Sequence, residues 1–180
     1  MSQPLPPKPA KLVMGFILRD KSLSNAIILE LVEKYGPLDF VSPWMSFEYT
    51  DYYEKEMGST LLRRVLVFKT LIQQSELPEI KVATNRVEKR YAIGENRRVN
   101  IDPGYLLLER FVLATGKNFP HRIYVGSGIY ADLTLIFTKG RFQTLPWTYP
   151  DYAGDDMRAL LEKIRDKYKI DLKLSEKGKR

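Results

Sequence analysis

The side chains that could carry chemistry gather in two stretches of the sequence, residues 50–58 and residues 100–151. The first stretch brings three carboxylates and two adjacent tyrosines into one short connector. The second contains the only histidine and one of the two tryptophans. Paired carboxylates can divide acid and base roles when their surroundings move their pKa values apart. An acid–base or carboxylate-metal enzyme is therefore one hypothesis, and its candidate catalytic residues are Asp51, Glu56, Asp102, His121 and Asp132, with Tyr53 or Tyr105 as proton donors.

The single histidine, His121, follows Pro120 at the start of a predicted strand. One interpretation is a strand-end residue with a hydrogen-bonding role. The other is a catalytic base, which needs a carboxylate within hydrogen-bond reach, and Asp102 and Asp132 are the natural candidates for it.

Residues 121–137 are predicted to form two strands joined by a three-residue turn at Gly126-Ser127-Gly128. Gly128 suits the left-handed position that closes such a turn. A phosphate-binding loop would need a helix after the glycines, whereas a strand follows here, so the pattern favours the turn. The turn sets a register in which Arg122 lies opposite Asp132, Tyr124 opposite Tyr130, and Val125 opposite Ile129.

This register separates an apolar face from a polar face, because side chains alternate along a strand and opposed residues share a face. The apolar face holds Ile123, Val125, Ile129, Ala131, Leu133, Leu135 and Phe137. The polar face holds Arg122, Tyr124, Tyr130, Asp132 and Thr134. The polar face is interpreted either as a solvated sheet face with an Arg122–Asp132 pair or as the floor of a binding site.

The leading functional hypothesis is a binding module that holds a small phosphorylated ligand, a nucleotide or a nucleic acid on this polar sheet face. Its candidate ligand-binding residues are Arg122, Tyr124, Tyr130, Tyr53, Tyr105 and Trp147. Trp147 and Tyr149 lie in a rigid segment between two prolines, where they are either lids on the core or stacking platforms. A homodimeric adaptor without a small ligand is the second alternative, since uncovered sheet faces commonly close by dimerisation about a two-fold axis.

Composition narrows these hypotheses. The chain has 180 residues, which suits a single domain. The absence of cysteine excludes disulfides, thiolate zinc sites and cysteine nucleophiles, and one histidine excludes a multi-histidine metal site within one chain. A metal would need carboxylate ligands and would be magnesium, calcium or manganese. No apolar run is long enough for a signal peptide or a membrane span, so a cytoplasmic protein with no membrane partner is expected.

The net charge of +7 is concentrated at the C-terminal end. Residues 163–180 hold eight Lys or Arg against three Asp or Glu, whereas residues 1–162 hold 21 against 19. Residues 1–10 are interpreted as a proline-rich leader, residues 11–168 as the folded body, and residues 169–180 as a basic tail that faces solvent. A second basic cluster, Lys81, Arg86, Lys89 and Arg90, is expected on the exposed side of a helix, with a phosphate contact as the alternative.

The elements that must position these side chains follow from periodicity and capping signals. Strands are predicted at 11–18, 39–49, 61–73 and 98–101. Helices are predicted after an N-cap at Ser22 or Ser24 and after Ser75, the second running to about Tyr91. This order, βαββαβ, is that of a ferredoxin-like core with an antiparallel sheet, so the fold class is α+β. Asp102-Pro103-Gly104 predicts a third helix that ends at Gly116, because Asp at the N-cap and Pro at the first turn start helices. A C-terminal β-hairpin or meander and a last helix at 155–168 complete the predicted fold.

Four strings of residues give the chain a family resemblance: 50–58, 100–105, 121–131 and 145–152. On these strings the chain resembles the bacterial domain-of-unknown-function family 4416, over nearly the whole length from Lys11 to the last helix. The resemblance implies a small soluble bacterial protein. It implies no activity and no catalytic residues.

Overall fold

The apolar first strand, β1 (Ala10–Leu18), lies at the centre of the sheet in the computed structural model, which describes residues 3–49 and 54–177. All nine of its residues are buried, so both faces of the sheet are covered here. β4 (Leu61–Ile72) and β5 (Val99–Leu106) pair with it antiparallel, one on each side. The predicted first and third strands are confirmed, and the fourth is longer than predicted.

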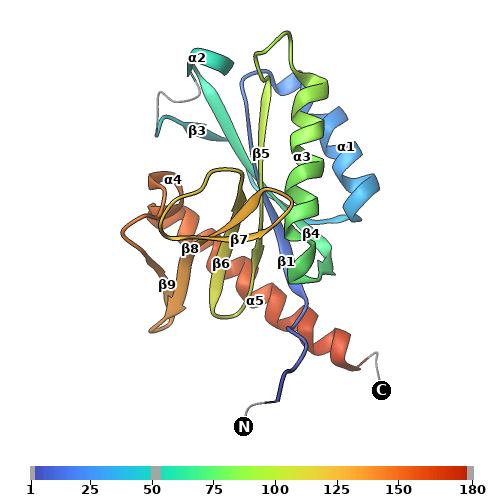
Figure 1. Ribbon diagram of the computed structural model, residues 1–180, viewed down its shortest axis with the longest axis vertical. Helices are drawn as coiled ribbons and strands as arrows, with labels where there is room; N and C mark the ends of the chain where they lie inside the picture. The colour runs from blue at the N-terminus through green and yellow to red at the C-terminus, as the bar shows by residue number, and fades with distance from the viewer. Residues whose placement is uncertain (1–2, 50–53, 178–180) are drawn as a thin grey trace.

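The described strands form one antiparallel sheet of nine, in the order β2-β4-β1-β5-β6-β8-β7, with β3 paired to β4 and β9 paired to β8 (Figure 1). Every pairing between these strands is antiparallel, as predicted. The remaining strands are β2 (Leu38–Val41), β3 (Met45–Phe47), β6 (Arg110–Thr115), β7 (Arg122–Gly126), β8 (Ile129–Thr138) and β9 (Arg141–Thr144). The predicted strand at 39–49 is thus two strands, which part on either side of Pro43.

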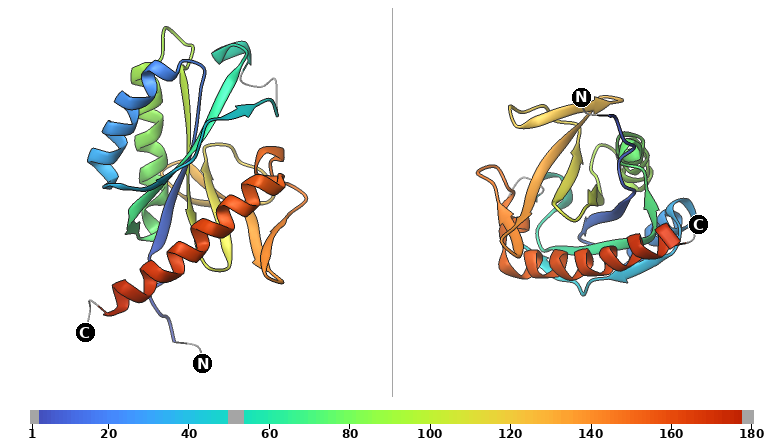
Figure 2. Two further views of the ribbon diagram at one scale, coloured as in Figure 1. Left: turned by 180° about the vertical axis from the view of Figure 1, so that it is seen from behind. Right: turned by 90° about the horizontal axis from the view of Figure 1, so that it is seen from below.

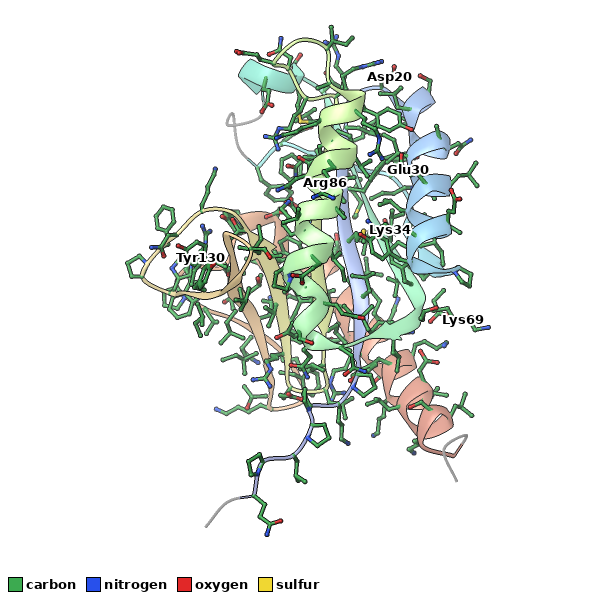
Figure 3. The ribbon with its side chains drawn as sticks, turned by 45° about the vertical axis from the view of Figure 1, so that its right-hand side comes forward. Asp20, Glu30, Lys34, Lys69, Arg86 and Tyr130 are labelled. Carbon is green, nitrogen blue, oxygen red and sulfur yellow. The ribbon has the colours of Figure 1, made fainter. Side chains whose placement is uncertain are left out.

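Two helices lie side by side along one face of the sheet (Figure 1). They are α1 (Ser24–Tyr35) and α3 (Leu77–Tyr91), and an ion pair joins Arg90 to Glu30 between them. Figure 3 shows Arg86 of α3 and Lys34 of α1 on their outer surface. Short helical segments complete the connections at η1 (Lys21–Leu23), α2 (Glu54–Met57), η3 (Gln74–Glu76) and α4 (Pro150–Ala153).

The last helix, α5 (Asp155–Lys177), crosses the sheet on the side opposite α3 (Figure 2). The last helix that the sequence predicts is confirmed, and its inward stripe consists of the buried residues Met157, Leu161, Ile164 and Tyr168. The helix continues to Lys177, and Leu172 is buried as well, so the interpretation of residues 169–177 as a tail is wrong. None of the helices in the described ranges is long and apolar enough to cross a membrane.

The predicted third helix after Asp102 is wrong, because residues 102–106 continue β5 and residues 110–115 form β6. The pairing of β5 with its neighbouring strands explains why proline and glycine stand at positions 103 and 104. Pro103 lies just before the point where β6 joins β5 at Gly104, so its missing N–H falls where β5 has a partner on one side only. A Cβ on Gly104 would lie 2.4 Å from the carbonyl oxygen of Val112, so only glycine allows the two strands to approach.

The hairpin at 121–137 has the predicted register, with Arg122 opposite Asp132 and Tyr124 opposite Tyr130. The pairing shifts at Val125, so that Gly126 rather than Val125 lies opposite Ile129, and Gly128 has the predicted positive φ of 74°. Burial differs from the prediction of a solvated polar face. Arg122, Asp132 and Thr134 are buried, whereas Ile123 is 70% exposed.

Candidate functional site

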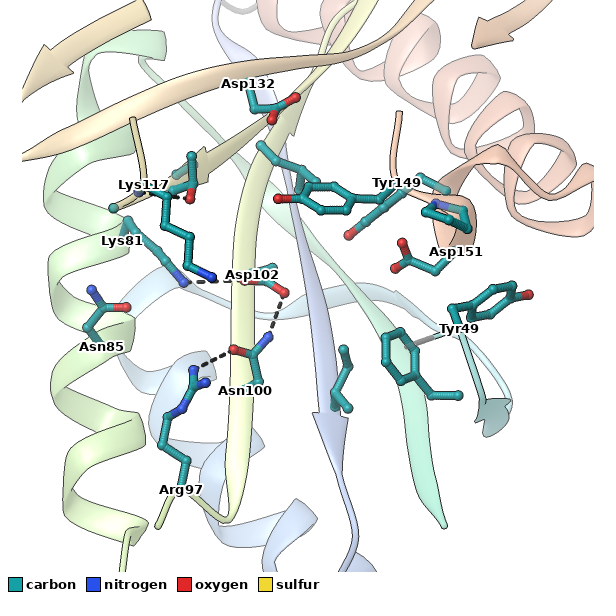
Figure 4. Close-up of a pocket in the computed structure, with 18 residues that line it drawn as sticks. Tyr49, Lys81, Asn85, Arg97, Asn100, Asp102, Lys117, Asp132, Tyr149 and Asp151 are labelled. Atoms are coloured by element: carbon teal, nitrogen blue, oxygen red, sulfur yellow. Dashed lines mark hydrogen bonds and ion pairs between the residues drawn. The ribbon is translucent and has the colours of Figure 1, made fainter. Parts of the chain in front are cut away.

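A fork in the sheet produces a polar pocket. β5 pairs with β1 along its whole length, but β6 pairs with β5 only from Gly104 to Leu106. Among the described residues, no strand pairs with residues 99–103 on that side. The opening is a pocket of about 710 Å³, which we call the fork pocket (Figure 4). Its charged lining residues are Lys81, Arg97, Asp102, Lys117, Asp132 and Asp151, and its lining tyrosines are Tyr49, Tyr149 and Tyr152.

Lys81 supplies one wall from α3. The residue is only 7% exposed, and its Nζ donates to the carbonyl oxygen of Ile101 at 2.8 Å and to Asp102 Oδ1 at 3.4 Å. The carboxylate of Glu88, two helical turns on, lies 3.8 Å from the same ammonium. Lysine is rarely buried without such partners. The structure therefore corrects the sequence interpretation of Lys81 as a solvated residue.

Asp102 is held by a chain of side chains along β5. Asn100 Nδ2 donates to Asp102 Oδ2 at 2.6 Å, and Arg97 Nη1 donates to Asn100 Oδ1 at 2.8 Å. Arg97 in turn donates to both oxygens of Glu56 at 2.7 and 2.8 Å. Each bond fixes the orientation of the next group, so this wall presents its polar atoms in one arrangement.

The pKa values of the two glutamates behind this wall, Glu56 and Glu88, are shifted in opposite directions. The hydrogen bond from Arg97 holds the pKa of Glu56 below its ordinary value. Burial raises the pKa of Glu88, although this carboxylate accepts from the backbone N–H of Ile101 at 2.7 Å. Glu88 is therefore easier to protonate than an ordinary glutamate, whereas Glu56 is harder to protonate.

The opposite wall is built from Asp151 and Tyr152, and Arg63 contacts both of them without lining the pocket. Arg63 Nη1 donates to Asp151 Oδ2 at 2.6 Å, and its guanidinium stacks on the Tyr152 ring at 4.2 Å from the centroid. Burial raises the pKa of both Asp151 and Tyr152. Gly15 on β1 provides room for the tyrosine, since a Cβ there would lie 2.8 Å from its hydroxyl oxygen. Perturbed acids in a pocket mark a candidate site, because burial and charge partners tune groups for chemistry.

Arg122 connects the remaining parts of the pocket. Its Nε donates to Asp132 Oδ2 at 2.9 Å, its Nη2 to the Tyr149 hydroxyl at 2.5 Å, and its Nη1 to the carbonyl oxygen of Lys117 at 3.0 Å. Asp132, Tyr149 and Lys117 all line the pocket, whereas Arg122 does not. Arg122 therefore positions lining residues from behind.

The structure brings together part of the predicted catalytic group. Asp102 and Asp132 both line the fork pocket. His121 lies behind Asp132, with Nε2 3.4 Å from Asp132 Oδ2 and its ring stacked on Trp147 at 4.9 Å. Glu56 does not line the pocket but reaches it through Arg97. Asp51 lies outside the described residues.

The predicted ligand-binding residues do not share one site. Arg122 is buried behind the pocket, and Tyr124 and Tyr130 pack edge-to-face on the hairpin at 5.4 Å between ring centroids. Trp147 Nε1 donates to the carbonyl oxygen of Leu133. Tyr105 packs against the core, and burial raises its pKa. Tyr53 lies outside the described residues.

Several lining residues are absent from the predicted catalytic and ligand-binding sets: Tyr49, Lys81, Asn85, Arg97, Asn100, Lys117, Tyr149, Asp151 and Tyr152. Of these, the sequence analysis offers Lys81 as an alternative phosphate contact and Tyr149 as an alternative stacking platform. A signal for Lys81 exists in the sequence. One face of the predicted helix carries residues at helical spacing, Leu77, Lys81, Thr84 and Glu88. Because this face begins with a leucine, the lysine and the glutamate on it indicate a buried ion pair. The tyrosines and Asp151 carry no comparable signal, because irregular segments place Tyr49 and Tyr149 and the short helix α4 places Asp151 and Tyr152.

Within ranges 3–49 and 54–177, no three His, Cys, Asp or Glu side chains are grouped as ligands for a metal ion. The lining offers paired cations and carboxylates beside aromatic rings. Such a set can bind a small molecule that carries both hydrogen-bond acceptors and donors.

Fold and site together define an α+β protein with a preorganised polar pocket at a fork in an antiparallel sheet. The chain matches the family described as "Domain of unknown function (DUF4416)" over residues 8–168, and it belongs to that family. The resemblance that the sequence suggests is thereby confirmed. Neither the curated proteins nor the solved structures that were searched contain a match.

Proposed function

We propose that this protein binds a small phosphorylated ligand, such as a nucleotide or a sugar phosphate, in the fork pocket. The observation that carries the proposal is Lys81, whose buried ammonium lines a pocket of about 710 Å³ beside Asp102. Pockets for small ligands occupy roughly 300–1,000 Å³ and carry a few fixed polar groups. The proposal moves the predicted binding function from the sheet face to this pocket.

The anionic end of the ligand would lie against Lys81 and Lys117. Both side chains extend toward the part of the pocket where Asp102 lies (Figure 4), and Asn85 lines the same side. Lys81 comes from α3 and Lys117 from the segment after β6, so two separate elements would hold one anionic group. Lysine is a common phosphate binder because its ammonium is a compact charge with three donors.

The other walls of the pocket suit a ligand that carries hydrogen-bond donors and a flat ring. Asp102 and Asp151 would accept from hydroxyl or amino groups, which a nucleotide or sugar phosphate supplies and a bare anion does not. Tyr49 and Tyr149, both about half exposed, offer ring faces at the mouth. Stacking of a base on an aromatic ring contributes roughly 1–3 kcal/mol. A nucleic acid could place one unpaired nucleotide in this pocket, but a duplex would not enter it.

Isothermal titration calorimetry with a panel of nucleotides and sugar phosphates tests the proposal. Lys117→Met removes one ammonium from the lining while keeping the bulk of the side chain. Lys89→Met is the matched control, since Lys89 is exposed on α3 outside the pocket. We expect a panel member to bind the wild type and the control equally, and Lys117→Met to bind about tenfold more weakly or worse. Equal affinity for all three proteins would contradict the proposal, as would a panel without any binder.

A second candidate function is acid–base catalysis in the same pocket. The observation that favours it is the pair Asp102 and Asp151, whose charges both act on Arg63 and Tyr152. Burial already raises the pKa of Asp151, as a general acid requires. Turnover of a bound ligand by the wild type, abolished in Asp151→Asn while the ligand still binds, would establish this function. Binding without turnover would leave the protein a binding module.

We also interpret the segment from β1 to β5 as a ferredoxin-like core to which β6–β9 and α5 are added. Its strands lie in the order β2-β4-β1-β5, and its two helices fall in the two crossovers, as in the split βαβ plan. A solved structure in which α1 or α3 lay on the other face of the sheet would contradict this interpretation.

A further inference from the structure

A second pocket lies at the end of the molecule where β1 ends, beside α2 and the turn between α3 and β5 (Figure 1). Its volume is about 370 Å³, which falls within the roughly 300–1,000 Å³ of sites for small ligands. We call it the arginine pocket, because three arginines from two separate parts of the chain line it. Its charged lining residues are Arg19, Asp20, Glu56, Arg97 and Arg98.

The charges of the arginine pocket do not cancel. Arg98 Nη2 lies 2.9 Å from Asp20 Oδ2, so these two residues form an ion pair. Arg97 Nε forms a second ion pair with Glu56 Oε1 at 2.7 Å. Arg19 has no carboxylate partner in the part of the chain that the structure describes. The lining therefore keeps one positive charge in excess, and that charge is on Arg19.

The guanidinium of Arg19 is exposed, but packing against the backbone holds it at the pocket. A Cβ on Gly58 would lie 2.7 Å from Arg19 Nη1, so the guanidinium lies directly against this glycine. Gly58 also has a φ of 82°, a conformation that other residues rarely adopt. The glycine thus leaves the space that Arg19 fills, and no carboxylate of the described ranges uses the N–H donors of Arg19.

The lining of the arginine pocket also has an apolar part. Ile93, in the turn after α3, is 67% exposed, and Met57 of α2 is buried. Contact with an apolar group would remove the exposed surface of Ile93 from water, which is favourable. A ligand that fits both parts of the lining carries a negative charge and a short apolar group.

We propose that the arginine pocket binds a small organic anion, whose carboxylate or phosphate group pairs with Arg19 and whose apolar part lies against Ile93. Guanidinium groups suit such oxyanions, because their planar N–H donors match two oxygens of one anionic group. The site is distinct from the fork pocket, although Arg97 lines both pockets. The proposal therefore does not depend on whether the fork pocket binds a nucleotide or a sugar phosphate.

Nuclear magnetic resonance titration with butyrate and with inorganic phosphate tests the proposal, at about 0.15 M salt so that long-range attraction is screened. We expect saturable shifts of the backbone amide signals of residues 93–96 with both anions. Arg19→Gln should raise the dissociation constants measured at these signals by about fivefold or more. Arg86→Gln is the matched control, since Arg86 is exposed on the outer surface of α3 (Figure 3), and it should bind like the wild type. No saturable shift with butyrate, or an equal loss in the two arginine variants, would overturn the proposal.

Two further variants separate the parts of the ligand and the two pockets. Ile93→Ser should weaken butyrate binding and leave phosphate binding unchanged, because inorganic phosphate has no apolar part. Ile170→Ser is the control, since Ile170 is 55% exposed on α5, far from the lining of this pocket. Lys117→Met should keep the wild-type dissociation constants at residues 93–96. Butyrate binding that Ile93→Ser leaves intact would overturn the proposal, and so would a loss in Lys117→Met, which would place the anions in the fork pocket.

Discussion

Three buried cations, Lys81, Arg63 and Arg122, hold the side chains of the fork pocket in place. Lys81, Arg63 and Arg122 are each nine-tenths buried or more, and each has a carboxylate partner. Removing one member of such a pair costs more than the pair contributes, because the other charge is left buried without a partner. The fork pocket is therefore lined or backed by groups that hold one another in place.

Gly15 gives the first prediction at this scale. A Cβ on Gly15 would lie 2.8 Å from the Tyr152 hydroxyl, and Tyr152 is buried and cannot move aside easily. Gly15→Ala should lower the free energy of unfolding by about 1–3 kcal/mol, measured by urea denaturation.

Tyr152→Phe removes the clashing oxygen and provides the control. The double variant should be less destabilised than the sum of the two single variants. Strict additivity would show that the alanine does not contact the hydroxyl.

Glu56 gives a prediction about pH. The hydrogen bond from Arg97 lowers the pKa of Glu56 in the folded state relative to the unfolded value of about 4.3. A lowered folded pKa means that the stabilisation is present above the unfolded value and is lost as pH falls through the folded value. Glu56→Gln should therefore be less stable than the wild type at pH 7, and the difference should shrink below about pH 4.

Thermal unfolding at pH 7 and at pH 3 measures this change. Glu95→Gln is the control, because Glu95 is exposed in the turn after α3. A Glu56→Gln deficit that stays constant across this range would contradict the ion-pair account.

Residue types alone predict little of the site. Asp102 and Asp132 are identifiable in the sequence as polar residues beside apolar strands, and both line the pocket. Asp151 and Tyr152 become site residues only because α4 turns them over Gly15, which no local pattern encodes. The hairpin shows a related limit: its register follows from turn geometry, but which face is buried depends on the Tyr149 segment that covers Arg122.

The helices and strands differ in how well local sequence predicts them. α1, α3 and the first part of α5 have long apolar stripes, and the structure confirms them. For the region of β5, the sequence predicts a short strand at 98–101 followed by a helix, since Asp102-Pro103-Gly104 has the pattern of a helix start. Residues 102–106 form a strand instead because they pair with β1, which is distant in the sequence, and because β6 approaches closely at Gly104.

The C-terminal part of α5 is held by a buried ion pair. Lys11 on β1 is fully buried, and its Nζ lies 2.6 Å from Asp39 Oδ2 and 2.5 Å from Asp171 Oδ2. The tyrosine hydroxyl of Tyr168 donates to the carbonyl oxygen of Pro9 at 2.7 Å in the same region. These contacts explain why the helix continues past the stretch that the charge pattern marks as a tail.

Asp171→Asn tests this account of α5. It removes one of two carboxylates from the buried Lys11 and should lower the free energy of unfolding by about 1–3 kcal/mol. Asp166→Asn, on the exposed side of the same helix, should change it by no more than about 0.5 kcal/mol. Urea denaturation of both variants measures the difference, and equal values would show that Lys11 does not depend on Asp171.

At the scale of the whole molecule, the sheet and the site have different causes. The α+β class and the antiparallel sheet follow from the order of apolar segments. The fork pocket does not, because it arises where β6 leaves β5 and where α3, β8 and the segment before α5 converge from distant parts of the chain. Long-range packing of this kind leaves no local pattern.

Native mass spectrometry tests the central claim most directly. The wild type, Lys117→Met and Lys89→Met are each equilibrated with the nucleotide and sugar phosphate panel, and each native spectrum is compared with its denatured spectrum. We predict a non-covalent adduct of one ligand per chain that disappears on denaturation, persists in Lys89→Met and is lost or strongly reduced in Lys117→Met. A wild-type spectrum without any adduct would contradict the account, and so would an adduct that Lys117→Met retains in full.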